Sequence, residues 1–262
     1  MSLVFSAIVP HPPILIPQIG KDNIKLLYST QSAYQSLAKK LHKHQPETIL
    51  VISPHGPTQP TAFVMNQSPQ FTATFATFGD LTTKTTYQGD IGLTHKIKES
   101  LENSASLQLI SKEKIDHGIS IPLHYLAVGS PKIKIIPAYN AGLSNEEHFK
   151  FGQALGNEIN YSTAKVAVFA SADLAHNLTK NAPAKYSPQG KKFDQKIIAY
   201  LQENKFKEIV GIDEKLAVNA RQCGLKPILM LLGILDGIHH KPKLLSYEYP
   251  FGVGYMVMNF EL

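Results

Sequence analysis

The sequence predicts an α/β fold in which one central mixed β-sheet carries helices on both faces. With 262 residues, of which 43% are hydrophobic, the chain can bury a full core, and it fits a single domain over 1–262 better than two small ones. No stretch combines linker composition with a sharp shift in charge. Apolar runs alternate with segments of helical periodicity, and this alternation is typical of a sheet covered by helices.

The strands are predicted from runs rich in Val, Ile and Phe. Their ranges are 3–9, 48–53, 62–66, 133–137, 165–171 and 253–260. The polar stretch 67–88, rich in Thr and Phe, is compatible either with edge strands or with an exposed loop that covers a site.

The helices follow from periodicity and from capping signals. Segment 23–44 places its apolar residues on one helical face. Ser144 with Glu147 three residues later predicts a capping box, and therefore a helix that begins there. Segment 193–201 predicts another amphipathic helix, and 225–238 predicts a buried one.

Charge and cysteine usage exclude several classes of protein. The net charge is +6, but the lysines are scattered and form no Arg-rich run of the kind that suits a nucleic-acid groove. The N-terminus lacks the long apolar region of a signal peptide, and the apolar run 227–235 is too short to span a bilayer. Cys223 is the only cysteine, which excludes an intrachain disulfide and a cysteine-rich zinc cluster. We expect a cytoplasmic protein that binds neither nucleic acid nor membranes.

Three histidines follow predicted strands at the point where each strand ends. His11 comes after the run 3–9, His55 lies in VISPHGP, and His176 lies just beyond the run 165–171. In α/β sheets, ligands bind in the crevice outside the carboxyl ends of the strands. We therefore expect the three imidazoles at one rim of the sheet, if the strands are parallel neighbours.

These residue types suit a metal centre. Two imidazoles and one carboxylate on one face of a metal are typical of non-haem iron(II) oxygenases. We choose His11 and His55 as the ligand pair, because each lies in a turn that contains proline or glycine, although histidines in such turns are more often structural. Glu248, at the boundary of the last strand, is the proposed carboxylate, with Asp116 and Asp173 as rivals.

The remaining candidates are assigned supporting roles. His176 and His117 are available to take and return a proton near neutrality, while a buried or turn histidine is the alternative reading of each. Cys223 precedes a predicted helix and is interpreted as packed at its start. Arg221, the only arginine, could recognise a substrate carboxylate, but a surface role is the more common one.

Five motifs, in order, carry a resemblance that covers nearly the whole chain. They are IVPHPPI, SPHGP, DHGISIPL, SADLAHN and YEYPFGVGY. This pattern resembles the class III extradiol ring-cleavage dioxygenases, in particular the catalytic B-subunit family typified by the protocatechuate dioxygenase beta subunit. The resemblance implies an iron(II) centre held by His11, His55 and Glu248. Zinc is the other metal considered, because it accepts the same ligands. The resemblance also implies His176 as the general acid and base, His117 beside the substrate, and a catechol- or aminophenol-type ring that is opened by dioxygen.

The same resemblance leaves alternatives open. Relatives often work with a small partner subunit, and a homo-oligomer is the other assembly considered. The sequence is also similar to the Memo-like branch, which has a cysteine where the dioxygenases have the glutamate. Glu248 in that place favours the dioxygenase side. The alternatives are a Memo-like metal-binding redox or assembly factor without ring cleavage, and a zinc hydrolase, since zinc accepts the same ligands.

Overall fold

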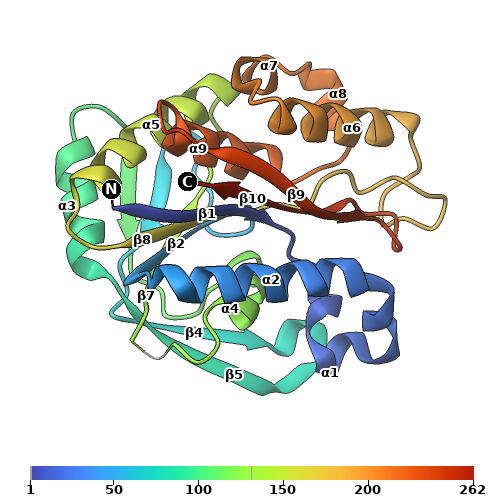
Figure 1. Ribbon diagram of the computed structural model, residues 1–262, viewed down its shortest axis with the longest axis horizontal. Helices are drawn as coiled ribbons and strands as arrows, with labels where there is room; N and C mark the ends of the chain where they lie inside the picture. The colour runs from blue at the N-terminus through green and yellow to red at the C-terminus, as the bar shows by residue number, and fades with distance from the viewer. Residues whose placement is uncertain (1, 131) are drawn as a thin grey trace.

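One mixed sheet runs through the molecule (Figure 1). The computed structural model describes residues 2–130 and 132–262. In that part of the chain the sheet has ten strands, in the order β4-β5-β7-β2-β8-β1-β10-β9, with β3 paired to β7 and β6 paired to β3. The strands are β1 (Leu3–Val9), β2 (Thr48–Ser53), β3 (Phe63–Asn66), β4 (Gln70–Phe75), β5 (Asp80–Gly89), β6 (Leu107–Ile110), β7 (Lys134–Tyr139), β8 (Val166–Ser171), β9 (Lys241–Glu248) and β10 (Tyr255–Glu261). The predicted fold class is confirmed.

The centre of the sheet is parallel and covered on both faces. β7, β2, β8 and β1 run side by side in the same direction, and β10 pairs with β1 in the antiparallel sense. Every residue of β2 and β8 is buried. Continuous apolar runs of this kind are expected of parallel strands with helices on both sides, which is why the sequence revealed these strands clearly.

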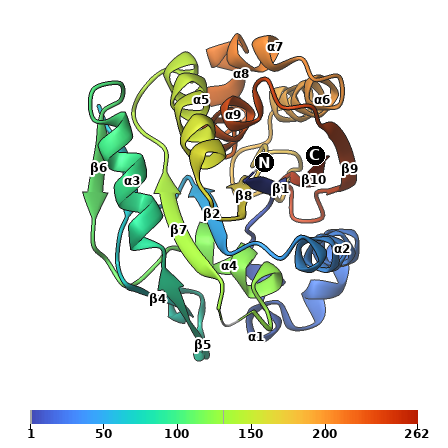
Figure 2. The same ribbon diagram turned by 60° about the vertical axis from the view of Figure 1, so that its left-hand side comes forward.

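The helices form two layers around the sheet (Figure 2). The α-helices are α1 (Pro17–Gly20), α2 (Tyr28–His44), α3 (Ile91–Leu101), α4 (His117–Leu126), α5 (Asn145–Tyr161), α6 (Pro188–Gln202), α7 (Phe206–Val210), α8 (Glu214–Asn219) and α9 (Leu225–Leu235). Helices α3, α5, α6 and α9 contribute to one hydrophobic core, and α2 and α4 contribute to the other. Both cores rest on the same sheet, so the described residues form a single layered unit.

The start of α5 agrees with the predicted capping box, whereas the start of α2 differs from the prediction. α5 begins at the predicted position, with Ser144 and Glu147 forming both hydrogen bonds of the capping box. The predicted helix 23–44 instead begins as the 3₁₀ helix η2 (Lys21–Leu27), and α2 follows from Tyr28. The N-cap of α2 is Leu27, whose apolar side chain cannot accept a hydrogen bond. The cap of α2 has to come from elsewhere in the chain.

The ambiguous segment 67–88 folds as a long hairpin. β4 and β5 pair with each other, and the 3₁₀ turn η3 (Ala76–Phe78) joins them. Only Gln88 and Gly89 of β5 pair with β7. We call 70–89 the arm. It lies beneath α2 and α4 in Figure 1 and extends along the molecule toward α1.

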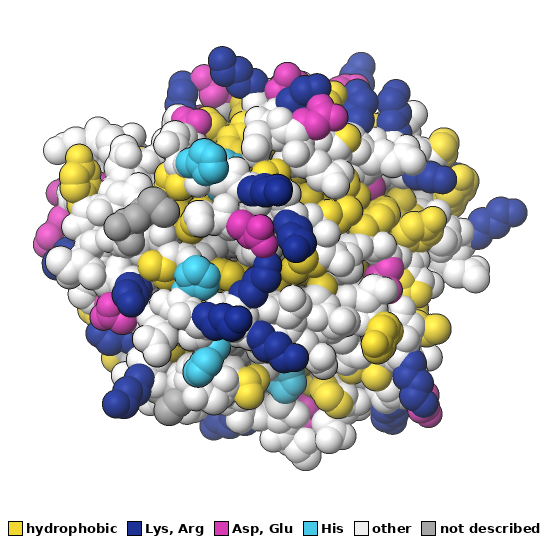
Figure 3. Space-filling view, in the orientation of Figure 1, with side chains coloured by type: hydrophobic (Ala, Val, Ile, Leu, Met, Phe, Trp, Pro, Cys, Tyr) yellow, Lys and Arg dark blue, Asp and Glu magenta, His cyan; other side chains and the backbone are white. Residues whose placement is uncertain are grey.

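The surface carries mixed charge. Figure 3 shows Lys and Arg side chains over the middle of one face and around its rim, interspersed with Asp and Glu. In the described part of the chain, we find no helix with both the length and the apolar character that a membrane span requires.

Candidate metal centre

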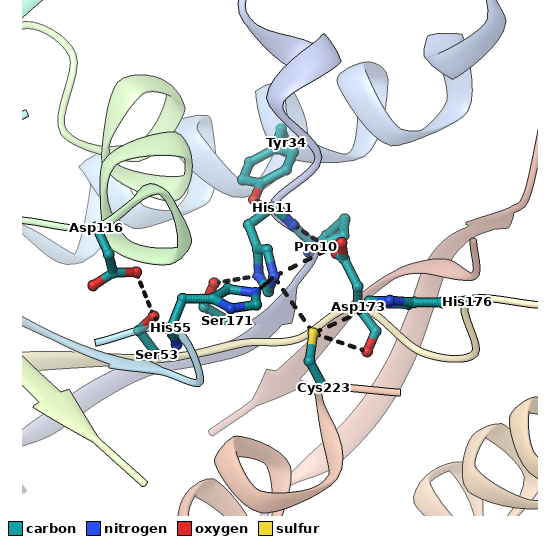
Figure 4. A network of polar contacts seen from close by, with 10 residues as sticks. All are labelled: Pro10, His11, Tyr34, Ser53, His55, Asp116, Ser171, Asp173, His176 and Cys223. Carbon is teal, nitrogen blue, oxygen red and sulfur yellow. Dashed lines mark hydrogen bonds and ion pairs between the residues drawn. The ribbon is translucent and has the colours of Figure 1, made fainter. Parts of the chain in front are cut away.

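Three loops meet at the carboxyl edge of the parallel strands. β1, β8 and β2 are neighbours, with Val9 opposite Ser171 and Ile52 opposite Ala170. Because these strands end at the same level, the residues that follow them share one rim. The structure thus brings together the loops that carry His11, His55 and His176, as the strand-end argument predicted (Figure 4).

A group of donor atoms lies at this rim. His11, His55 and Cys223 each offer one ligand atom, and these atoms lie within 4.8 Å of one another. The Nε2 atoms of His11 and His55 are 2.9 Å apart, and the Cys223 Sγ is 3.5 Å from the His11 Nε2. Donors on one tetrahedral zinc-like ion stand about 3.3–3.6 Å apart, from bond lengths near 2.0 and 2.3 Å. The group is therefore already close to the size of a metal site.

His11 is the most firmly held member of the group. Its backbone N–H donates to the Asp173 Oδ1 at 2.8 Å, and its Nδ1 hydrogen-bonds the Ser171 Oγ at 2.8 Å. The side chain of Tyr34 also donates to the carbonyl of the preceding Pro10. A partner on Nδ1 fixes the ring and leaves Nε2 free to bind a metal. The rigid strand end thus aims one nitrogen of His11 at the shared site.

His55 is held through a serine and an aspartate. The Ser53 Oγ accepts a hydrogen bond from the backbone N–H of His55 at 3.2 Å and donates to the Asp116 Oδ1 at 2.6 Å. The second carboxylate oxygen of Asp116 is buried without a hydrogen-bond partner. Asp116 and Asp173, the rival carboxylates from the sequence, therefore hold the loops of the two histidines. The Asp173 Oδ2 also lies 3.7 Å from the His11 Nε2, but neither carboxylate belongs to the donor group.

Cys223 is the site residue that sequence reasoning missed. It precedes α9, and its Sγ lies 3.7 Å from the Asp173 carbonyl oxygen and 3.8 Å from the His176 Nε2. A Cβ on the next residue, Gly224, would stand 2.7 Å from the Ala172 Cβ, so only glycine lets α9 approach this closely. The available signal was a cysteine followed by glycine at the start of a helix that is apolar except for Lys226.

Glu248, the carboxylate proposed from the sequence, lies elsewhere. It ends β9, and its Oε1 accepts a hydrogen bond of 2.7 Å from the backbone N–H of Thr30. Thr30 is the third residue of α2, so this carboxylate supplies the N-terminal cap that Leu27 cannot. Among the residues described, the third donor beside His11 and His55 is Cys223 in place of Glu248.

The two remaining imidazoles surround the donor group. His117 begins α4, and its ring stacks on that of His55 with centroids 4.3 Å apart. His176 faces the Cys223 sulfur, and its backbone N–H donates to the Ala220 carbonyl at 3.0 Å. Arg221 is exposed and follows α8 in the left-handed conformation, with φ +55°. No contact in the described structure places it in the donor group.

Burial keeps these imidazoles neutral. The pKa of His11 is well below its usual value, first through burial and then through repulsion by His55, His117 and His176. Burial also lowers the pKa of His117, to about 4, and that of His176. For Cys223, burial followed by the nearby Asp173 raises the thiol pKa. The apo site thus holds neutral nitrogens ready for a metal and a thiol whose proton a metal would displace.

A large groove lies away from this site. It has a volume of about 1400 Å³ and lies between α2 and α4, where it is lined by Thr48 and Lys134 at the amino ends of β2 and β7. The imidazoles stand at the opposite edge of the sheet. The chemistry of the donor atoms, rather than the size of a cavity, identifies the candidate site.

Known proteins resemble this chain in sequence and in fold. Residues 6–258 match the family described as the catalytic LigB subunit of aromatic ring-opening dioxygenase. The Clostridium acetobutylicum protein CA_C1420 is 30% identical over 271 residues, which cover 100% of this chain and 58% of that protein. The chain thus spans under two thirds of this relative. The uncharacterized protein JW3007 from Escherichia coli K12 has the same fold, with a TM-score of 0.70, 16% identity and coverage of 98% and 99%. The chain belongs to the family of catalytic LigB subunits of aromatic ring-opening dioxygenases.

Proposed function

We propose that this chain is a metal-dependent redox protein whose centre is held by His11, His55 and Cys223. The observation that carries the proposal is the convergence of three donor atoms within 4.8 Å at the carboxyl edge of the sheet. Neutral imidazoles and a displaceable thiol proton suit metal binding. The whole of 1–262 would act as one catalytic domain, because the donors come from both ends of the chain.

The donor set does not fit the iron(II) centre that the resemblance implies. That centre uses two histidines and a carboxylate, whereas here the third donor is the sulfur of Cys223. Thiolate ligands select copper(I) or zinc, and two histidines with one cysteine are typical of redox copper sites. A cysteine in this place is what the resemblance to the Memo-like branch implies. We therefore favour copper as the redox metal, and zinc as its closest competitor.

The protein's own residues have separable roles in this proposal. Ser171 and Asp173 orient His11, while Ser53 and Asp116 orient the loop of His55. His176 and His117, neutral at pH 7, can each accept a proton from a ligand that enters beside the metal. When bound, copper would supply one-electron chemistry.

Metal uptake tests the proposal. Purified protein is loaded anaerobically with copper(I), iron(II) or zinc, desalted, and analysed for metal content in the wild type, in Cys223→Ser and in Glu248→Gln. We expect one copper per chain in the wild type and in Glu248→Gln, and a sharp loss in Cys223→Ser. Stoichiometric iron that depends on Glu248 and not on Cys223 would refute this assignment and restore the iron centre.

Opening of an aromatic ring is the second candidate function, and the family match over residues 6–258 favours it. The substrates would be a small aromatic vicinal diol or an aminophenol together with dioxygen, and His176 would take and return the diol proton. Oxygen uptake and the absorbance of the ring-opened product, measured with catechol and with 2-aminophenol, test this activity. Turnover by the wild type that is lost in His176→Ala would support it. Full metal loading without any oxygen uptake would reject it.

A further inference from the structure

One loop brings two polar side chains to the metal centre. Residues 172–177 follow β8, and Figure 4 shows Asp173 and His176 of this loop beside Cys223. Asp173 accepts the backbone N–H of His11 at 2.8 Å, and the His176 Nε2 lies 3.8 Å from the Cys223 Sγ. The loop belongs to no named helix or strand. Its shape must therefore be set by contacts with other parts of the chain.

Asp194, on α6, holds this loop at the residue that precedes His176. The Asp194 Oδ1 accepts a hydrogen bond of 2.9 Å from the backbone N–H of Ala175. The Oδ2 accepts a hydrogen bond of 2.7 Å from the hydroxyl of Tyr247, on the edge strand β9. One carboxyl group thus joins α6, the loop and β9.

The chain just before β10 closes the other side of the loop. The backbone N–H of Gly254 donates to the Ala175 carbonyl oxygen at 2.8 Å, and the Leu174 N–H donates to the Gly254 carbonyl oxygen at 2.8 Å. A Cβ on Gly254 would overlap with the Asp194 Oδ2, so only glycine lets this segment lie against the carboxyl group. Both backbone polar groups of Ala175 are therefore occupied, and the direction in which the chain enters His176 is fixed.

A carboxyl group in the place of Asp194 is costly. The exposed fraction of Asp194 is 0%, and none of the ion pairs among the described residues includes it. Burial of such a group lowers stability unless hydrogen bonds offset the loss of water. An apolar residue would fill the same space at a lower cost. The two donors that Asp194 accepts, and above all the one from the loop, therefore account for a carboxyl group at this position.

We propose that Asp194 is a positioning residue, which acts through the loop 172–177 to hold His176 and Asp173 against the metal centre. This inference rests on the proposed function, because it takes the donor group as the metal centre. Asp194 is not itself a member of that group, and its effect passes through the backbone of Ala175. Without the carboxyl group, the unpaired N–H of Ala175 would turn toward water and draw the neighbouring imidazole away from the donors.

The single cysteine of the chain gives a reporter that needs no metal. Because Cys223 faces the loop, displacement of the loop exposes its sulfur. The rate at which iodoacetamide alkylates Cys223 is followed by mass spectrometry in the folded, metal-free protein. The wild type is compared with Asp194→Ala and Asp194→Asn. Should Asp194→Ala fail to fold, Tyr247→Phe removes only the donor on Oδ2 and should show a smaller increase of the same kind.

Asp90→Ala is the matched control. Asp90 is also buried, and it also accepts one hydrogen bond from a backbone N–H, that of Leu93, and one from a hydroxyl, that of Thr48. Thr48 begins β2, so this carboxyl group lies at the opposite edge of the sheet. The unfolding free energy of each variant is measured in urea. Both alanine variants should lose stability, whereas only the one at the loop should change the reactivity of Cys223.

We expect Cys223 to react about ten- to a hundredfold faster in Asp194→Ala, the factor that corresponds to one buried donor left unpaired. Asp194→Asn keeps an acceptor for the Ala175 N–H and should stay within about threefold of the wild type. Asp90→Ala should match the wild type. After loading with copper(II), the absorption band of the metal-bound thiolate should shift in Asp194→Ala and stay in place in Asp194→Asn and Asp90→Ala.

Failure of this inference and failure of the proposed function are distinguishable. Equal alkylation rates in Asp194→Ala and Asp90→Ala would overturn the positioning role and leave the metal centre intact. A wild type that takes up no copper would overturn the proposed function, while the alkylation rates, measured without metal, would still decide whether Asp194 holds the loop against Cys223.

Discussion

Removal of the Glu248 side chain should cost stability and leave the metal centre intact. The Oε1 of Glu248 accepts the N–H of Thr30 at 2.7 Å and brings a negative charge to the start of α2. Loss of a helix cap costs about 0.5–2 kcal/mol, and a charge at a helix N-terminus contributes about 0.3–1 kcal/mol. Glu248→Ala should therefore lower the unfolding free energy by about 1–2 kcal/mol, and Glu248→Gln, which keeps an acceptor, by less than about 1 kcal/mol.

Thermal and urea unfolding measure this effect. For a chain of this size, 1 kcal/mol corresponds to about 2–4 °C in Tm, so Glu248→Ala should melt about 2–8 °C below the wild type. Glu99→Ala, which removes an exposed glutamate from α3, is the matched control and should not change Tm. Copper content should be unchanged in both variants. If Glu248→Ala kept the wild-type Tm but lost its metal, the capping assignment would be refuted and the carboxylate would return to the ligand set.

Three further outcomes are expected. Ser171→Ala removes the partner of the His11 Nδ1 and should weaken metal binding about ten- to a hundredfold in a chelator competition; unchanged affinity would mean that the backbone alone orients the ring. Because burial raises the pKa of the Cys223 thiol, metal binding should release its proton, and affinity should rise about tenfold per pH unit from about pH 6 to 8, a slope that Cys223→Ser should abolish. Burial raises the pKa of Asp194 to about 7, so the folded protein keeps a proton that the unfolded chain loses near pH 4. The free energy of unfolding should therefore fall as the pH rises from about 4 to 7, by up to about 1.4 kcal/mol per pH unit for this group. The free energy is measured by urea unfolding at several pH values. The same dependence on pH in Asp194→Asn would contradict this expectation.

The parallel centre of the sheet could be predicted because its strands are buried on both faces. β1, β2 and β8 are dominated by apolar residues, with only Ser6 inside β1, and the three histidines that follow these runs lie at the expected edge of the sheet. β9 was missed because its half-exposed sequence, KPKLLSYE, begins with lysine and proline and shows no apolar run. The stretch 67–88 could not be resolved from its sequence, because polar β-strands and polar loops have similar compositions.

The proposed third donor, Cys223, was not expected from the sequence, because a glutamate and a cysteine each suit more than one role. A glutamate at a strand boundary suits a metal ligand or a helix cap equally well, and only the tertiary contact between Glu248 and Thr30 shows that it caps α2. A cysteine before an apolar helix is usually packed in the core. The distance between Cys223 and His11 depends on how α9 packs against β8, and the periodicity of the sequence does not determine this packing.

The separation of the donors along the chain has a consequence for biosynthesis. His11 and Cys223 are 212 residues apart, so a ribosome must deliver most of the polypeptide before the two can meet. Domains of this size fold through partly formed intermediates, and an intermediate without a docked α9 would offer a metal only the two histidines. If the proposed ligand set is correct, full metal affinity would appear only after the sheet has closed around both ends of the chain. Metal occupancy would mark molecules that have completed folding, and a nascent or truncated chain would not retain the ion.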